Sequence, residues 1–318
     1  MNSKTKNSIS EEILKKMAYQ AFPTEKVKAA KELTEGYFNT AYLITFESGK
    51  EVILKIAPLK DIQVQSYEKD IMKAEVECME LVRQAVEVPI PKVLYYDFSR
   101  TIYASDYFFM TRLKGDSLNS IKETLTEEER NSVELLTGKY NKEINSITGR
   151  GFGYYNKVEE NKLWVDVFLG FFKDLFEDAE RISLDIGLHY SDIEKLMEKH
   201  REYFLEVTVP RLVHWDLWEG NVFVKDKTIT GLIDFERCMW ADVLLEVGFR
   251  SHNQKPDFLE GYGKKTFTEA EHVRILWYDL YLFVVTSMES DFRGYPDRGM
   301  YYWAKEEIEK NLAELKIK

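Results

Sequence analysis

Two short polar motifs, each placed after an apolar run, constrain this chain more than any other feature of its sequence. The first has the spacing H-x-D-x-x-x-x-N and consists of His214, Asp216 and Asn221. The second is Asp234, thirteen residues after the asparagine, at the end of an apolar run. The β-rich segments 212–224 and 228–235 predict a strand-rich island, so these polar residues are expected where strands end.

This constellation predicts a site for phosphoryl transfer. The transferred group carries negative charge, and Mg²⁺, which neutralises it, prefers hard oxygen ligands. We therefore expect the Asn221 amide and the Asp234 carboxylate to be the metal ligands, and Asp216 to be the catalytic base near the attacking hydroxyl. Because a carboxylate with a pKa of about 4 is a weak base for an alcohol, Asp216 is expected to orient the hydroxyl and to take its proton late. A core histidine and two strand-ending aspartates would explain either motif alone, but two linked motifs favour the functional interpretation.

A lysine in the first part of the chain can serve the other half of such a site. The runs 43–46 and 52–56, joined by Glu47-Ser48-Gly49-Lys50, predict a β-hairpin. Lys55 lies in its second strand, where it can reach the phosphates of a nucleotide if a carboxylate holds it. Taken alone, Lys55 would equally suit an edge strand as a solubilising residue.

The segment 67–85 has apolar residues at helical spacing and is expected to supply that carboxylate. Glu75 and Glu77 are the two candidates. We choose Glu75, because Ala74 and Cys78 place the packed face of the helix beside it. One glycine, Gly36, precedes the hairpin; a plain turn would explain it, but its position before the Lys55 strand makes it a candidate for a phosphate loop.

The pattern of elements and charges divides the chain near Gly115. Residues 1–114 hold 17 basic and 16 acidic side chains, and the remainder holds 27 basic and 39 acidic side chains. We expect an α+β fold with two lobes: an N-terminal lobe over 1–110 with a small antiparallel sheet and one helix, a hinge over 111–115, and a larger, mainly helical lobe over 116–318. Helix starts in the second lobe are predicted by three capping-box pairs: Thr126 and Glu129, Ser191 and Glu194, and Thr268 and Glu271.

The composition limits the functional class. Hydrophobic residues make up 44% and charged residues 31% of the 318 residues, as in globular proteins. The formal charge of −11 provides no global basic field for nucleic acid or an anionic membrane, so neither is expected as a partner. Two cysteines cannot form a disulfide framework, and no apolar segment has the length of a signal core or membrane span. We expect a cytoplasmic monomer or homodimer that acts on small molecules.

At this point the residues resemble a known family, the aminoglycoside phosphotransferase and choline-kinase-like group of small-molecule kinases, which are relatives of the protein kinases. The resemblance runs over about 33–246 and rests on the loop Gly36 to Asn39, Lys55, the Glu75 helix leading into Val88-Pro89-Ile90-Pro91, the connection Phe109 to Gly115, the run His214 to Asn221, and Asp234-Phe235-Glu236.

The resemblance implies a kinase-like bilobal fold, ATP or GTP with Mg²⁺ as cofactors, phosphate contacts from Gly36 and Asn39, and His214 as a support for the catalytic loop. The hinge would receive the adenine or guanine: the Thr111 carbonyl and the Leu113 N–H would pair with the base, and Met110 would pack behind it.

Two departures from the family pattern stand out. The segment that ends at Glu246 is similar to the family's G-D-P-x-x-D/E stretch, but Ala241 and Val243 replace its glycine and proline. Asp-Phe-Glu in place of Asp-Phe-Gly separates the chain from ordinary protein kinases and argues against protein substrates.

The acceptor is the least determined part of the prediction. The 27 basic and 39 acidic residues after position 114, a net charge of −12, suit a cationic acceptor such as an aminoglycoside, although acidity also simply keeps proteins soluble. Glu219, Glu236 and Glu289 are the candidate contacts. We expect transfer of the γ-phosphate to a hydroxyl of an aminoglycoside-like acceptor, with a role in antibiotic resistance.

Several alternatives stay open. His-x-Asp-Leu-Trp-x-Gly-Asn is also similar to the fructosamine kinases, so a fructosamine- or choline-type metabolite kinase is one of them. A catalytically silent nucleotide-binding protein of the same fold is another. A weaker alternative is a metal-dependent hydrolase that uses Asp216, Asp234 and His214.

Overall fold

The N-terminal part of the chain forms a five-stranded antiparallel sheet in the order β1-β2-β3-β5-β4. The computed structural model describes residues 3–34, 36 and 38–318. The strands of this sheet are β1 Val27–Leu33, β2 Thr40–Phe46, β3 Glu51–Ile56, β4 Val93–Asp97 and β5 Tyr107–Thr111. Along β2 every second side chain is buried, as expected for a strand with one face on a core. The predicted hairpin is confirmed, with Gly49 at a φ of 87° in its turn.

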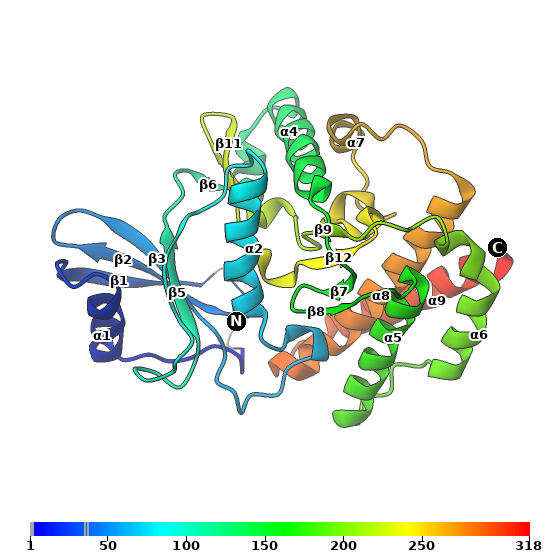
Figure 1. Ribbon diagram of the computed structural model, residues 1–318, viewed down its shortest axis with the longest axis horizontal. Helices are drawn as coiled ribbons and strands as arrows, with labels where there is room; N and C mark the ends of the chain where they lie inside the picture. Colours follow the sequence, from blue (N-terminus) through cyan, green and yellow to red (C-terminus); the bar gives the residue numbers. More distant parts are fainter. Residues whose placement is uncertain (1–2, 35, 37) are drawn as a thin grey trace.

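Two helices accompany this sheet, where the sequence predicted one. The additional helix is α1, Glu11–Ala21, whose N-cap Ser10 accepts a hydrogen bond from the Ile13 N–H. Its buried side chains Leu14 and Met17 pack in the same core as Phe46 and Phe109 of the sheet. The second helix is α2, Ile71–Ala85, which starts four residues later than predicted because Asp70 adopts a left-handed conformation (φ 56°). α2 lies between the sheet and the helical part of the molecule (Figure 1).

The connection between the two parts is fixed by a glycine. The two-residue strand β6, Asp116–Ser117, follows β5 and pairs with β10, Val222–Lys225, of the second part. Gly115 has a φ of 92°, and a Cβ at this position would lie 2.1 Å from the Val224 carbonyl oxygen. Any other residue would therefore both strain the backbone and clash with it. The boundaries 111–115 for the hinge stay a prediction.

The second part is mainly helical, as predicted, and it carries two small sheets, β11-β10-β6 and β8-β7-β12-β9. Its strands are β7 Phe152–Tyr154, β8 Lys157–Glu159, β9 Arg211–Val213, β10 Val222–Lys225, β11 Thr228–Leu232 and β12 Met239–Ala241. Its helices are α3 Leu118–Ile121, α4 Glu127–Ser146, α5 Trp164–Arg181, α6 Tyr190–His200, α7 Pro256–Tyr262, α8 Glu269–Arg293 and α9 Gly299–Ile317.

Two of the three predicted capping boxes are present, at Thr126 and at Thr268. The third is wrong: α6 begins at Tyr190 with His189 as its N-cap, so Ser191 lies inside the helix. A spacing of S/T-x-x-E indicates a helix start only if the serine or threonine stays outside the first turn.

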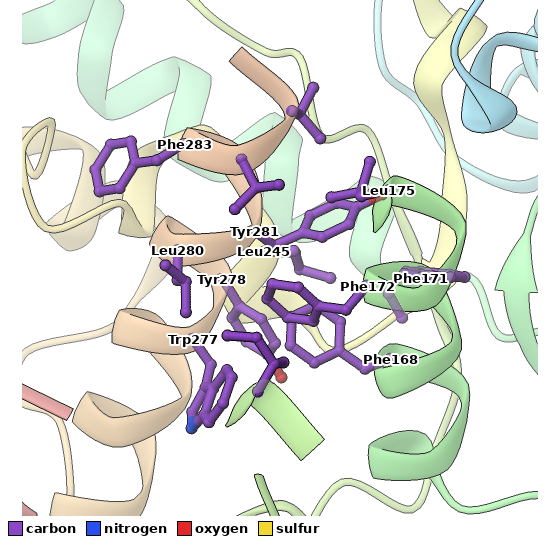
Figure 2. Close-up of a cluster of buried hydrophobic side chains, with 14 of the residues drawn as sticks. Phe168, Phe171, Phe172, Leu175, Leu245, Trp277, Tyr278, Leu280, Tyr281 and Phe283 are labelled. Carbon is purple, nitrogen blue, oxygen red and sulfur yellow. The ribbon is translucent and has the colours of Figure 1, made fainter. Parts of the chain in front are cut away.

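An aromatic core holds α5 against α8. Phe168 and Phe172 from α5 pack edge-on against Tyr281 of α8, with ring centroids 5.7 and 5.6 Å apart (Figure 2). Tyr281 and Phe283 belong to this core. Among the described residues, no helix combines the length and the apolar character needed to cross a membrane.

Candidate active site

The predicted catalytic loop runs from the end of β9 to the start of β10 and is shaped by the buried imidazole of His214. Its Nε2 lies 3.1 Å from the Ile233 carbonyl oxygen, and its Nδ1 accepts a hydrogen bond of 3.3 Å from the Asp216 N–H. Because a carbonyl oxygen only accepts, Nε2 carries the proton. His214 thus ties the catalytic loop to the strand that leads into Asp234.

Asn221 closes the loop onto Asp216. Its side-chain amide nitrogen donates to the Asp216 backbone carbonyl at 2.7 Å and to Asp216 Oδ2 at 3.3 Å. Since the nitrogen makes these contacts, the amide oxygen is the atom that a metal would use. The structure therefore brings together the base and one ligand that the motif predicted.

A buried carboxylate outside both motifs anchors this loop. Glu246 is fully buried and accepts hydrogen bonds from the backbone N–H groups of His214 (2.8 Å) and Trp215 (3.0 Å). The side chains of Asn141 and Asn145 donate to it as well, each at 2.8 Å. Trp215 itself has a φ of 64°, so Glu246 holds a residue in a conformation that is costly for a bulky side chain.

Lys55 lies at the meeting point of the two lobes. Its Nζ is 2.8 Å from both carboxylate oxygens of Glu75 on α2 and 2.6 Å from Oδ1 of Asp234. Glu75 is fully buried, whereas the Glu77 side chain is 43% exposed, in agreement with the choice that helical periodicity favoured. Residues 55, 75 and 234 thus converge as predicted.

Glu236 belongs to the same cluster, and its contact with an acceptor stays a prediction. It is 5% exposed, its Oε2 lies 3.6 Å from Lys55 Nζ, and it accepts a hydrogen bond from the Asn39 side chain. Ligand atoms of Glu75, Asp234 and Glu236 all lie within 4.8 Å of one another. Three carboxylates around one position offer the hard oxygen ligands that Mg²⁺ prefers.

The pKa values of this cluster follow from burial and from Lys55. Burial raises the pKa of Glu236 to about 8 and that of Glu75 to about 7. Burial acts in the same direction on Asp234, but the Lys55 ammonium outweighs it and lowers the pKa of that carboxyl group. The pKa of Asp216 is raised, because burial outweighs the nearby Arg237.

The predicted nucleotide contacts differ in burial and in their partners within the protein. Gly36 is exposed and Asn39 is buried, with an amide oxygen that has no hydrogen-bond partner among the described residues; Tyr37 of the same loop lies outside them. In the hinge, Met110 is buried, the Thr111 N–H donates to the Lys92 carbonyl, and the Leu113 side chain packs over Gly231. Their contacts to a nucleotide stay predictions.

The other acceptor candidates are already paired within the protein. Glu219 binds Lys122 (2.8 Å) and Lys255 (2.6 Å). Glu289 on α8 lies 3.4 Å from the Arg237 guanidinium group. Whether either contacts an acceptor stays a prediction.

Sequence reasoning missed Arg237, which follows the Asp-Phe-Glu run. Its guanidinium group lies over the rings of Tyr67 and Trp215, 5.4 and 5.9 Å from their centroids. No local spacing signals this contact, since the two aromatic residues come from distant segments. The role of Glu246 was also missed, although the segment that it ends is similar to a stretch of the family pattern.

Comparisons with known proteins identify relatives of this arrangement. A model of the Phosphotransferase enzyme family matches residues 29–275. Two curated Aspergillus fumigatus proteins, from strains CBS 144.89 and ATCC MYA-4609, are described as subtelomeric hrmA-associated cluster proteins. Each is 27% identical over 129 residues, which are 40% of this chain and only a quarter (25%) of the relative's length.

Solved structures share the fold at low identity. An aminoglycoside phosphotransferase, APH(4)-Ia, in complex with ADP and hygromycin B is 17% identical with a TM-score of 0.67, and a GDP and kanamycin complex of APH(2")-IIia is 16% identical with a TM-score of 0.62. A putative fructosamine-3-kinase from Thermobifida fusca is 15% identical with a TM-score of 0.67. Each comparison covers 94% of this chain and 98% of the other.

These likenesses confirm the predicted kinase-like bilobal fold, and the family model spans both lobes and all of the motifs above. The chain belongs to the phosphotransferase enzyme family.

Proposed function

We propose that this protein transfers the γ-phosphate of ATP or GTP to a hydroxyl group of a small, amine-bearing acceptor. The observation that carries the proposal is the convergence of Lys55 and Glu75 from the first part of the chain with Asp234 from the second. A lysine held by a carboxylate is the group that positions nucleotide phosphates in kinase-type sites. The complexes of similar proteins with ADP and with GDP support a nucleotide as the donor.

The donor atoms around Asp234 fit Mg²⁺. Asn221 and Asp234 would hold the ion, and Glu236 lies close enough to Asp234 to join them. The bound ion would neutralise charge on the phosphates. In the protein alone, Lys55 lies between these carboxylates and compensates them. Metal binding would therefore have to release part of the Lys55–Asp234 contact and free the ammonium group for the nucleotide.

Asp216 would orient the acceptor hydroxyl and receive its proton. As the bond from the acceptor oxygen to the γ-phosphorus forms, the bond from that phosphorus to the bridging oxygen breaks, and the nucleoside diphosphate leaves. The hydroxyl proton passes to a carboxylate oxygen of Asp216. Asn221 donates a hydrogen bond to that carboxylate, and His214 accepts one from the Asp216 backbone N–H, so both would hold Asp216 in place.

An aminoglycoside-like acceptor is the first candidate, since the second part of the chain is acidic and similar structures are complexes with hygromycin B and kanamycin. A ketosamine acceptor is the second candidate, because the putative fructosamine-3-kinase is as similar in fold as the aminoglycoside enzyme.

The test is nucleotide-dependent phosphate transfer to a panel of aminoglycosides, ketosamines and choline with the wild-type and Asp216→Asn proteins. General-base assistance is worth about 10²- to 10⁴-fold, so the variant should lose at least about a hundredfold in turnover. Asn221→Ala and Asp234→Ala should abolish Mg²⁺-dependent activity. Turnover of Asp216→Asn within a few-fold of wild type would show that the role of Asp216 is wrong. Bound nucleotide without product from any acceptor would instead favour the silent protein.

A further inference from the structure

The peptide group between Trp215 and Asp216 is held at both of its polar atoms. Its carbonyl oxygen accepts a hydrogen bond of 2.7 Å from Nη2 of Arg250, and its N–H donates to Nδ1 of His214 at 3.3 Å. A peptide group is planar, so two fixed atoms fix its plane and with it the direction of the bond to the Cα atom of Asp216. Arg250 therefore acts on the predicted base, although it lies outside both motifs.

The backbone at Trp215 needs this support. Its φ of 64° is a conformation that a bulky residue keeps only where its surroundings enforce it. Glu246 accepts the Trp215 N–H at 3.0 Å, and Arg250 donates to the carbonyl of the same residue. Without a partner on the carbonyl, Trp215 could relax towards a negative φ. That change would rotate the peptide group and carry the Asp216 carboxylate with it.

One short element supplies both of these holding groups. The 3-10 helix Val247–Phe249 has Glu246 immediately before it and Arg250 immediately after it, and all three of its own residues are buried. The next backbone N–H, that of Ser251, donates to Asp279, a fully buried carboxylate of α8. Arg250 is therefore presented to the catalytic loop by a segment that is anchored on both sides.

No ion pair explains this arginine. Within the residues that the structure describes, Arg250 pairs with no carboxylate, and its side chain bonds only to the Trp215 carbonyl oxygen. Arg237, which also lies beside the catalytic loop, is by contrast paired with Glu289 at 3.4 Å. A guanidinium group that held a carboxylate would be accounted for by that pair. The half-buried Arg250 instead spends its contact on the backbone of the loop.

We propose that Arg250 is a positioning residue for phosphate transfer, which fixes the peptide group before Asp216 and so holds the Asp216 carboxylate against the acceptor hydroxyl. The inference rests on the proposed function, in which Asp216 receives the hydroxyl proton. Arg250 acts on the rate of transfer and not on nucleotide binding. The groups proposed for the phosphates and the metal, Lys55 and Asp234, are held by each other and not by Arg250.

The first experiment compares turnover with nucleotide binding in Arg250→Met. Turnover is measured as phosphate transfer from ATP and from GTP, with Mg²⁺, to kanamycin and, without an acceptor, to water. It should fall about 10- to 100-fold, because a displacement of about 1 Å can cost that much. The dissociation constant of a non-hydrolysable ATP analogue with Mg²⁺, measured by calorimetry, should stay within about twofold of the wild-type value. Arg250→Lys, whose ammonium group can donate to the same carbonyl, should be at least about fivefold faster than Arg250→Met.

A double-mutant cycle separates positioning from a general loss of structure. Asp216→Asn removes the group through which Arg250 acts, so Arg250→Met should lower the turnover of Asp216→Asn by less than about twofold. A general distortion would cost the same factor with and without Asp216. Arg250→Gln, whose amide is too short to reach the Trp215 carbonyl, repeats the cycle with a polar side chain. Arg201→Met is the control and should keep wild-type turnover, because its guanidinium group pairs with Asp166 of α5 instead.

Hydrogen–deuterium exchange reports on the loop itself and needs no turnover. The amides of the peptide that contains Trp215 and Asp216 should exchange about tenfold faster in Arg250→Met and Arg250→Gln than in the wild type, because the loop opens more often. Exchange in Arg250→Lys and Arg201→Met should stay close to that of the wild type.

The inference is overturned if Arg250→Met keeps wild-type turnover, if it lowers turnover equally with and without Asp216, or if exchange in the loop is unchanged. Loss of turnover in Asp216→Asn with an unaffected Arg250→Met would refute the inference and leave the proposed function intact. Wild-type turnover in Asp216→Asn would refute the proposed function, whereas faster exchange in Arg250→Met would still show that Arg250 holds the loop.

Discussion

Replacing Glu246 by glutamine tests how the catalytic loop is held. One oxygen of Glu246 accepts three hydrogen bonds, from the His214 N–H and the amides of Asn141 and Asn145, and the other accepts the Trp215 N–H at 3.0 Å. All the groups that face this carboxylate are donors. Glutamine has the same shape but offers one oxygen and one NH₂ group.

In Glu246→Gln the oxygen would stay with the three donors, and the NH₂ group would face the Trp215 N–H. Two buried donors would then lack acceptors, each at a cost of about 1–3 kcal/mol. We therefore expect the free energy of unfolding to fall by about 2–6 kcal/mol. Trp215 would also lose the contact that offsets its strained backbone, so Asp216 would move and turnover would drop.

Urea denaturation monitored by tryptophan fluorescence measures the loss of stability, and phosphate transfer measures turnover. Glu260→Gln is the control, since Glu260 is exposed on the nearby helix α7. A stability change below about 0.5 kcal/mol for Glu246→Gln, the usual range for surface substitutions, would refute the idea that this carboxylate organises the loop.

Two further predictions concern buried charges. Arg293→Met should lower the free energy of unfolding, measured by urea denaturation, by about 3–5 kcal/mol, because it leaves the buried Glu68 without its bidentate partner. Arg298→Met breaks a half-exposed ion pair and should lower this free energy by less than about 1 kcal/mol. Equal effects of the two substitutions would contradict this reasoning. The pKa of Glu236, raised to about 8, means that the folded protein keeps a proton that the unfolded chain loses near pH 4.5. The stability of the metal-free protein should therefore fall as the pH rises from about 5 to 8. Glu236→Gln should flatten the plot of melting temperature against pH over this range. If the variant keeps the slope of the wild type, Glu236 does not lose its proton in this pH range and the reasoning is wrong.

The residues that the sequence located best are those that a local pattern fixes. Asp216 and Asn221 lie on one loop between two strands, so their spacing dictates their proximity. Glu75 was separated from Glu77 by helical periodicity alone. Lys55 meets Asp234 across 179 residues, and only the similarity of both motifs to one kind of site suggested that contact.

The features that the sequence did not reveal depend on tertiary contacts. α1 has a clear N-cap at Ser10, but its apolar face matters only because the sheet offers Phe46 and Phe109 to cover. Glu246 and its donors Asn141 and Asn145 are about a hundred residues apart. A buried carboxylate with four donors has no local signature, because its neighbours come from other elements.

Glu236 shows how the backbone sets the surroundings of a charged side chain. Its charge makes it a candidate contact for a cationic acceptor, and this stays a prediction. Asp234 adopts a left-handed conformation (φ 71°), and a short 3-10 helix over 235–237 follows it. This turn sends Phe235 into the core against the His214 ring, Glu236 towards Lys55, and Arg237 over the rings of Tyr67 and Trp215. Three consecutive side chains thus enter the core, the cluster around Lys55 and an aromatic pair, because the left-handed conformation of Asp234 turns the chain just before them.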